Sequence, residues 1–232
     1  MKQHISGESG GSLRAADRRF NDREDAGRRL AAQLEEYAGR DDVVVLGLPR
    51  GGVPVAAEVA NILGVTLDIM VVRKLGTPGH AELAMGAIAS GGAHVVNPRI
   101  IEQGGITDAQ LQEEIERQKI ELQRRERKYR GDRPFPELED RTVLLVDDGL
   151  ATGATMRAAV QALRQYEPRE VVVAVPVAPQ HIQDSVLREA DRFVALLQPE
   201  PFYAVGQWYR NFDQTDDTEV AELLAAARGA VQ

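Results

Sequence analysis

The chain has 232 residues, a formal net charge of −8 and a sequence pI near 5.1, and it contains no cysteine. Its length fits one large domain, and its acidity argues against a broad nucleic-acid-binding face because phosphates would be repelled. The lack of cysteine excludes disulfides and thiolate catalysis. No apolar run approaches the roughly 18 residues of a membrane span, and residues 1–16 lack the apolar core of a signal peptide. We therefore expect a cytoplasmic protein.

The first part of the chain begins with a Gly/Ser-rich polar segment, residues 1–19, which we expect to be a flexible tail. The main domain would then occupy residues 20–232. Apolar residues at helical spacing predict a first helix, and a continuous apolar run predicts a strand covered on both faces. The elements expected here are a helix from about Asn21 to Gly39, a strand at 43–48, a helix at 54–63 and a strand at 65–72.

The middle of the chain is predicted to hold a loop, a hairpin and one long helix. Residues 73–86 are rich in glycine, proline and polar residues, which is typical of a loop. Short apolar segments on both sides of the glycine pair at 91–92 resemble a hairpin. Thr107 and Gln110 resemble a capping box, and the inserted charged helix that follows, 107–130, carries only a thin apolar stripe.

The last part of the chain alternates strands with helices again. Apolar strands that alternate with helices are typical of an α/β fold with a mainly parallel, twisted sheet flanked by helices. Ligands of such sheets bind at the carboxyl ends of the strands. The elements expected here are strands at 142–146, 171–177 and 192–197, and helices at 156–166, 181–190 and 217–228.

One loop has a composition that points to a ligand. Asp147 and Asp148 follow the strand at 142–146, and a Gly/Thr-rich string leads from them into a helix. Backbone N–H groups at a helix N-terminus form an anion site. Two adjacent carboxylates would repel a phosphate, but they would accept hydrogen bonds from the vicinal hydroxyls of a sugar. A ribose 5-phosphate meets both requirements.

The segment 143–155 resembles the diphosphoribose-binding signature of the type I phosphoribosyltransferases, and the order of elements matches over residues 20–197. The resemblance implies a type I phosphoribosyltransferase-like fold with a small hood and a long charged helix, and a site for 5-phosphoribosyl-1-diphosphate. Asp147 and Asp148 would contact the ribose hydroxyls and, through substrate or water, a metal. The 5-phosphate would lie on Gly149, Ala151, Thr152, Gly153, Ala154 and Thr155.

A second match is the loop at 47–54, which resembles the diphosphate-binding loop of xanthine–guanine phosphoribosyltransferases. Arg50 would bind the diphosphate bidentately, next to Gly51. Family members often have a non-proline cis peptide in this loop, which here would be Pro49–Arg50. A simple strand-to-helix turn is the alternative interpretation.

The loop predicted at 73–86 corresponds to the mobile lid of the family. Lid closure would keep water away from a transition state that resembles an oxocarbenium ion. Arg73 would contact substrate, Lys74 would neutralise the leaving diphosphate and Glu82 would act as an acid or base, although all three are also compatible with ordinary solvated loop charges. Mg²⁺ is the expected cofactor, because it prefers phosphate oxygens, water and few carboxylates.

The acceptor is expected under a hood formed, with the C-terminal helix, by residues 198–232. Trp208 would stack on a planar ring, and packing of the final helix is the alternative role for it and for the neighbouring aromatic residues. Ala151 stands where hypoxanthine–guanine enzymes carry an acid, and the stretch 175–179 lacks their lysine. A 6-oxopurine acceptor is therefore disfavoured, and the phosphate loop resembles that of adenine phosphoribosyltransferases. The aromatic residues concerned are Phe202, Tyr203, Trp208, Tyr209 and Phe212.

We therefore expect a magnesium-dependent transferase that moves phosphoribose from 5-phosphoribosyl-1-diphosphate to a nitrogen acceptor, such as a nucleobase, and releases diphosphate. Two alternatives stay open: a regulatory protein that senses the same donor or a nucleotide, and a hydrolase or phosphorylase in which Glu82 would activate water. We expect a homodimer without nucleic-acid or membrane partners. The basic stretch at 124–133 is interpreted as a solvated helix face, with an anion or a protein partner as the alternative. The four histidines show no metal-ligand spacing.

Overall fold

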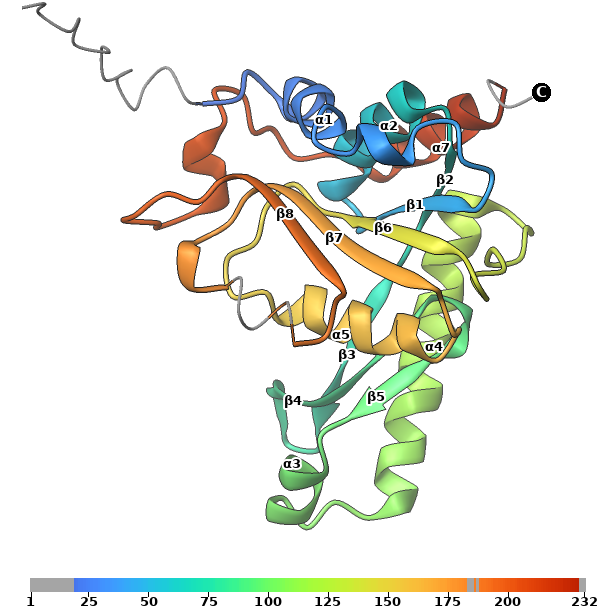
Figure 1. The fold of residues 1–232 in the computed structure, drawn as a ribbon. Helices are drawn as coiled ribbons and strands as arrows, with labels where there is room; N and C mark the ends of the chain where they lie inside the picture. The colour runs from blue at the N-terminus through green and yellow to red at the C-terminus, as the bar shows by residue number, and fades with distance from the viewer. Residues whose placement is uncertain (1–18, 183–185, 187, 230–232) are drawn as a thin grey trace, which may run out of the picture.

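A computed structural model of the chain describes residues 19–182, 186 and 188–229 (Figure 1). Its central sheet has five strands in the order β2-β1-β6-β7-β8, and all neighbouring strands are parallel. This arrangement confirms the α/β fold that the strand and helix pattern predicted. The strands are β1 (Val43–Gly47), β2 (Thr66–Ile69), β6 (Thr142–Val146), β7 (Glu170–Val177) and β8 (Arg192–Leu197).

Helices cover both faces of this sheet, which explains why its strands are apolar without alternation (Figure 1). Side chains alternate between the two faces of a strand. Val43 and Val45 of β1 therefore pack into one core cluster, whereas Val44 and Leu46 pack into the other. The first cluster lies under α1 (Arg23–Ala31), α2 (Gly52–Leu63) and α7 (Asp217–Gly229), and the second lies over α5 (Ala154–Arg164).

A separate lobe extends below the sheet in Figure 1, and it corrects one prediction. Residues 73–86 are not a loop, because β3 and β4 pair in an antiparallel hairpin from Val72 opposite Ala89 to Thr77 opposite His80. The lobe consists of β3 (Val72–Thr77), β4 (His80–Ala89), β5 (His94–Val96), α3 (Pro98–Gln103) and α4 (Asp108–Arg130).

The glycines that suggested a loop have a different physical role in this hairpin. Gly79 has φ +78° in the turn between the two strands, a conformation that glycine adopts without steric cost. A Cβ on Gly86 would lie 2.3 Å from the backbone oxygen of Val95, so the missing side chain allows β5 to approach β4. The same composition therefore serves a tight turn and close strand packing rather than an unstructured segment.

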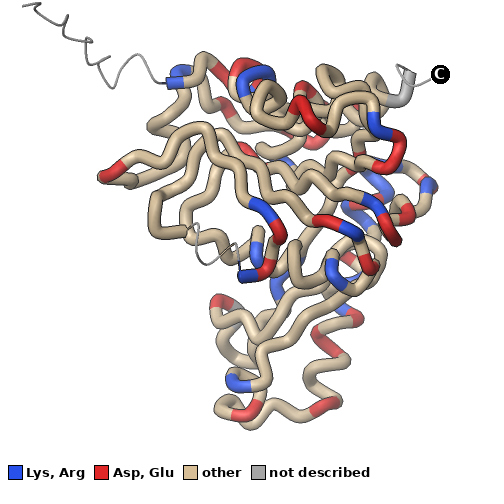
Figure 2. The backbone as a smooth tube through the Cα atoms, viewed as in Figure 1, with Lys and Arg blue, Asp and Glu red and all other residues tan. Residues whose placement is uncertain are grey.

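The long helix α4 begins with the predicted capping box, in which Thr107 and Gln110 exchange hydrogen bonds. Acidic and basic residues are interspersed along this helix (Figure 2). Most basic side chains at its C-terminal end form ion pairs within the chain. Arg124 and Arg125, for example, both contact Glu121. The interpretation of residues 124–133 as a solvated helix face is wrong for Arg130, because the side chain of this residue is buried.

The helix predicted from about Asn21 to Gly39 is too long, because α1 ends at Ala31 and only a 3-10 turn at Glu35–Tyr37 follows it. Most other predicted elements agree with the structure to within a few residues, or lie outside the described part of the chain. The strands at 142–146 and 192–197 have the predicted bounds, and the predicted strand at 65–72 is divided between β2 and β3. Most of the expected tail at 1–19 lies outside the described residues. So does part of the expected helix at 181–190, which begins as a 3-10 turn at Gln180–Ile182. Within the described residues, no helix is both long and apolar enough to cross a membrane.

Candidate functional site

The two predicted binding loops meet at the carboxyl edge of the sheet. Asp147 and Asp148 directly follow β6, and Gly51 and Gly52 lie between β1 and the body of α2. A Cβ on Gly51 would lie 2.0 Å from Asp148 Oδ2, and one on Gly52 would lie 2.8 Å from Asp147 Cα. Since β1 and β6 are parallel neighbours, the glycine pair lets the first loop approach the acidic residues closely.

The loop from Gly149 to Thr155 has the geometry of an anion site. Gly153 has φ +67° and caps α5, so a left-handed residue turns the chain into the helix. The hydroxyl of Thr152 accepts a hydrogen bond from Ala154 N at 3.4 Å. Thr152, Ala154 and Thr155 are exposed, and the first N–H groups of a helix have no intrahelical acceptor. A phosphate at this end of α5 would meet both backbone and hydroxyl donors.

Arg50, in the loop between β1 and α2, contacts a carboxylate of α7 rather than the acidic pair. The Pro49–Arg50 peptide bond is cis, as the resemblance implied. Arg50 Nη1 lies 3.9 Å from Asp217 Oδ1 at the start of α7. Asp217 also accepts hydrogen bonds from Lys128 Nζ at 2.6 Å and from the Tyr129 hydroxyl at 2.5 Å. These two donors hold the pKa of Asp217 down at about 2.

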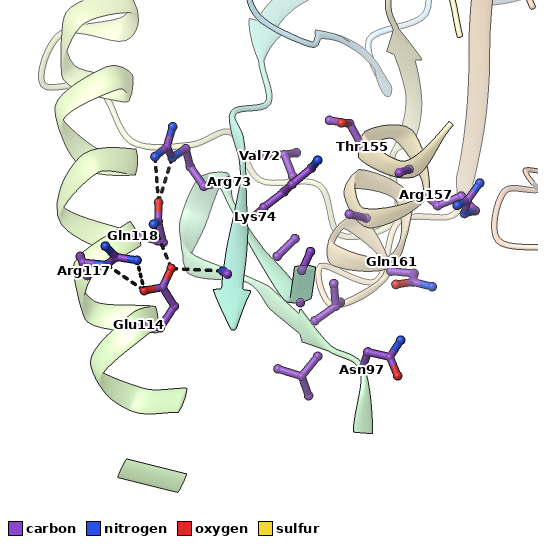
Figure 3. Close-up of a pocket in the computed structure, with 18 residues that line it drawn as sticks. Val72, Arg73, Lys74, Asn97, Glu114, Arg117, Gln118, Thr155, Arg157 and Gln161 are labelled. Carbon is purple, nitrogen blue, oxygen red and sulfur yellow. Dashed lines mark hydrogen bonds and ion pairs between the residues drawn. The ribbon is translucent and has the colours of Figure 1, made fainter. Parts of the chain in front are cut away.

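A cavity of about 610 Å³ lies between α4, β3 and α5, beside the phosphate loop (Figure 3). Thr155 belongs to its lining, as do Arg73, Lys74, Arg117 and Arg157. Lys74 is exposed and forms no ion pair with any described residue. The cavity is therefore a basic feature in a chain of net charge −8, which favours an anionic ligand.

The other cations of this cavity have defined partners. Arg73 donates two hydrogen bonds to Gln118 Oε1, at 3.1 and 2.9 Å, and burial lowers its pKa. Arg157 Nη1 donates to the carbonyl of Thr152 at 3.0 Å. The predicted acid or base, Glu82, is exposed on β4 and is not part of the cavity lining. Its role therefore stays a prediction.

The hood segment, defined here as residues 198–216, packs onto the site with some of its aromatic residues, whereas Tyr203 is exposed. The Tyr209 hydroxyl donates to the backbone oxygen of Asp148 at 2.6 Å. Trp208 is half-buried in a cluster with Phe20 and Tyr209, and its indole nitrogen is buried without an acceptor among the described residues. A Cβ on Gly149 would lie 2.6 Å from Val205. This packing favours a structural role for Trp208 and Tyr209 over stacking on an acceptor.

Arg23 is a site residue that the sequence reasoning missed. Its Nε and Nη2 atoms both lie 2.9 Å from Asp148 Oδ2. The only sequence signal is its position in the first turn of α1, where the helix dipole favours acidic side chains rather than an arginine. Nothing local in the sequence indicates a contact with a residue 125 positions away.

Burial dominates the electrostatics of the acidic pair. Burial, and secondarily the Asp148 carboxylate, raise the pKa of Asp147 well above its ordinary value. Burial also raises the pKa of Asp148, although the neighbouring Arg23 guanidinium opposes this change. Carboxylates that are largely buried together in this way are more common at functional sites than elsewhere.

Known proteins share both the sequence and the fold. The chain is 50% identical over 209 residues to "Putative phosphoribosyl transferase Rv0571c" of Mycobacterium tuberculosis (strain ATCC 25618 / H37Rv), a match that covers 90% of this chain and 47% of the relative. The chain thus spans about half the length of the curated relatives it matches first. It is also 33% identical over 141 residues to "Bifunctional protein PyrR" of Ralstonia nicotianae, which covers 54% of this chain and 78% of that protein.

A solved structure and a family model cover most of the chain. The crystal structure of TT1426 from Thermus thermophilus superposes with a TM-score of 0.79 at 44% identity, and the match covers 90% of this chain and 98% of TT1426. The family model described as "Phosphoribosyl transferase domain" matches residues 19–200, which include the acidic pair and both binding loops. The chain therefore belongs to the phosphoribosyl transferase domain family.

Proposed function

We propose that the chain is a magnesium-dependent transferase that moves phosphoribose from 5-phosphoribosyl-1-diphosphate to a nitrogen acceptor and releases diphosphate. One observation carries this proposal. Two largely buried carboxylates lie at the carboxyl edge of a parallel sheet, directly before a Gly/Thr loop that opens α5. A ligand with a phosphate and a vicinal diol has groups that match this arrangement.

The donor would extend over three parts of the edge. Its ribose hydroxyls would donate to Asp147 and Asp148, and its 5-phosphate would accept hydrogen bonds from the first turn of α5. The diphosphate would then lie between the loop of Arg50 and the basic cavity that contains Lys74. A contact with diphosphate requires Arg50 to exchange its 3.9 Å interaction with Asp217 for one with the ligand.

Mg²⁺ fits the donor set of this edge. Carboxylate oxygens of Asp147 and Asp148 are the ligand type that Mg²⁺ accepts. Within the described residues, no group of three or more histidine, aspartate or glutamate side chains could hold a metal by itself. We expect the donor's own oxygens to hold the ion, with Asp147 and Asp148 acting on it through the donor or water. When bound, the ion would supply neutralisation of the diphosphate charge.

The chain's own residues would contribute mainly position and charge. The acidic pair and the phosphate loop would hold the ribose from two sides, which fixes its reacting carbon relative to the acceptor. Arg50 and Lys74 would stabilise the negative charge that develops on the leaving diphosphate. The acceptor nitrogen would attack from the face opposite the diphosphate, so that the configuration at the anomeric carbon inverts.

A regulatory protein that senses the same donor is the second candidate function. One observation favours it: Glu82, the predicted acid or base, is absent from the cavity lining and is exposed on β4. We retain the expectations of a homodimer and of a cytoplasmic location as parts of the proposal. Light scattering of the purified chain would test the first of them.

Isothermal titration calorimetry would test the donor site. Wild type should bind 5-phosphoribosyl-1-diphosphate with Mg²⁺ at micromolar affinity, and the double variant Asp147→Asn/Asp148→Asn should lose at least about a hundredfold in affinity, since each lost charged acceptor costs about 1.5–3 kcal/mol. Asp132→Asn is the matched control, because its side chain is 97% exposed. Absence of binding by folded wild type would refute the transferase proposal.

The second part of the experiment separates an enzyme from a sensor. Diphosphate release would be measured with a panel of nucleobases and amines as acceptors. Release that depends on an acceptor and is lost in the double variant supports the transferase. Binding without release for any acceptor supports the sensor, and release without any acceptor indicates a hydrolase.

A further inference from the structure

The carboxylate oxygens of the acidic pair are used unequally. Asp148 N donates to Asp147 Oδ1 at 2.9 Å, and Arg23 donates to Asp148 Oδ2 from two nitrogens. No described residue donates to Asp147 Oδ2 or to Asp148 Oδ1. Each carboxylate is thus held by one oxygen and has its second oxygen available for a ligand.

Arg23 is itself held in place at all three guanidinium nitrogens. Besides the two contacts with Asp148, its Nη1 atom donates to the backbone oxygen of Asp213 at 2.6 Å. The guanidinium carbon lies 4.0 Å from the centre of the Phe212 ring, and the side chain is only 12% exposed. A planar guanidinium held in this way directs its donors to fixed positions, which a lysine ammonium would not do.

Gly51 lies directly against the same oxygen of the Asp148 carboxylate. A Cβ at this position would lie 2.0 Å from Asp148 Oδ2 and 3.3 Å from Arg23 Nε. The held oxygen therefore lies in a narrow space between the diphosphate loop and the arginine. Because both neighbours restrict this oxygen, the orientation of the other one is restricted as well.

We propose that Arg23 is a positioning residue for the sugar of the donor, which fixes the Asp148 carboxylate so that Oδ1 accepts a hydrogen bond from a ribose hydroxyl. This inference rests on the proposed function and adds a residue to its site. It also connects the hood segment to the sugar site, since Phe212 and Asp213 hold the arginine.

The experiment measures two affinities by calorimetry with Mg²⁺, that for 5-phosphoribosyl-1-diphosphate and that for inorganic diphosphate, which has no ribose hydroxyls. Arg23→Gln should weaken binding at least about tenfold at neutral pH, the equivalent of one charged hydrogen bond. Its affinity for inorganic diphosphate should equal that of wild type, because diphosphate has no hydroxyl that donates to Asp148. Arg28→Gln on the same helix is the control and should match wild type, because Arg28 is 50% exposed and lies 3.8 Å from Glu58.

The outcomes separate this inference from the proposed function. Absence of binding by wild type refutes the proposed function and this inference with it. Normal affinity for the donor in Arg23→Gln, or an equal loss of affinity for inorganic diphosphate, refutes this inference alone and would leave Arg23 as a structural link between α1 and the hood segment. If Arg23→Gln does not fold, Arg23→Lys replaces it. An intermediate affinity for the donor with wild-type affinity for inorganic diphosphate is then expected, and donor affinity equal to wild type would refute the positioning role.

Discussion

Two largely buried arginine–carboxylate clusters in this molecule have the same components in different arrangements. At the junction of α4 and β2, the side chains of Arg130 and Asp68 are 2% and 8% exposed. At the carboxyl edge of the sheet, those of Arg23 and Asp148 are 12% and 15% exposed. Each cluster holds one guanidinium and two carboxylates, since Glu126 joins the first and Asp147 the second.

The arrangement of the charges separates a structural cluster from a candidate site. Arg130 lies between its two carboxylates, donates to Asp68 and Glu126 through different nitrogens, and uses a third nitrogen for the carbonyl of Ile69. Of the two carboxylates at the sheet edge, Arg23 contacts only that of Asp148. Among the described residues, both carboxylates of the first cluster contact the guanidinium, whereas Asp147 of the second forms no ion pair and keeps a charge that a ligand could satisfy.

Removal of the structural arginine should have the largest effect on stability. Arg130→Ala would leave Asp68 buried without its partner, which typically costs about 3–5 kcal/mol. For a chain of this size we expect a fall in melting temperature of roughly 6–20 °C, measured by thermal unfolding. Arg127→Ala should change it by less than about 2 °C, because Arg127 is 77% exposed. Equal effects of both variants would contradict the structural assignment of this cluster.

A methyl group at Gly51 should disturb the cluster of Arg23 and Asp148 at the sheet edge without unfolding the chain. Gly51 has φ −60° and ψ −30°, which any residue adopts, so the obstacle is the Asp148 carboxylate that the Cβ would meet. We expect Gly51→Ala to weaken donor binding by about tenfold or more, the loss of one charged hydrogen bond. Calorimetry would measure this change. Gly104→Ala, in the lobe at φ −80°, is the control and should bind the donor normally.

Asp147→Asn should increase stability, in contrast to the usual effect of a mutation. The folded-state pKa of Asp147 is raised above its unfolded value, so ionisation of the carboxylate destabilises the fold at neutral pH, and this penalty disappears below the unfolded pKa of about 3.9. We expect a melting temperature about 2–4 °C higher at pH 7, or about 1 kcal/mol. The difference should shrink as the pH approaches about 4. A variant that is less stable than wild type at neutral pH would contradict the charge argument.

The smallest effect concerns the carboxylate that holds Arg50. In the folded chain the pKa of Asp217 is about 2, below its value in the unfolded chain. The stability that this carboxylate contributes is therefore fully present above the unfolded-state pKa and is lost as the pH falls through about 2. Asp217→Asn should release Arg50 at neutral pH and tighten inorganic diphosphate binding by about two- to threefold, since partly exposed ion pairs contribute at most about 1 kcal/mol. Calorimetry with Glu219→Gln as the control would measure it, and weaker diphosphate binding would show that Asp217 helps to orient Arg50.

The sequence by itself determined the features that depend on local order. The strand at 142–146 is recognisable because both its faces are buried, and the loop that follows it because glycines and hydroxyls are needed around an anion. The capping box at Thr107 and the left-handed cap at Gly64 are likewise properties of a few adjacent residues. These local rules were sufficient to predict the parallel sheet and the edge that holds the candidate site.

Only the tertiary structure decided which residues complete that site. Residues 73–86 have a loop-like composition, but pairing with β5 and packing against α4 turn them into strands. Arg23 reaches Asp148 across 125 positions, and Trp208 enters an apolar cluster rather than an open pocket. The physical reason is the same in each case: a contact between distant segments depends on the packing of entire elements, and no short pattern of residues encodes it.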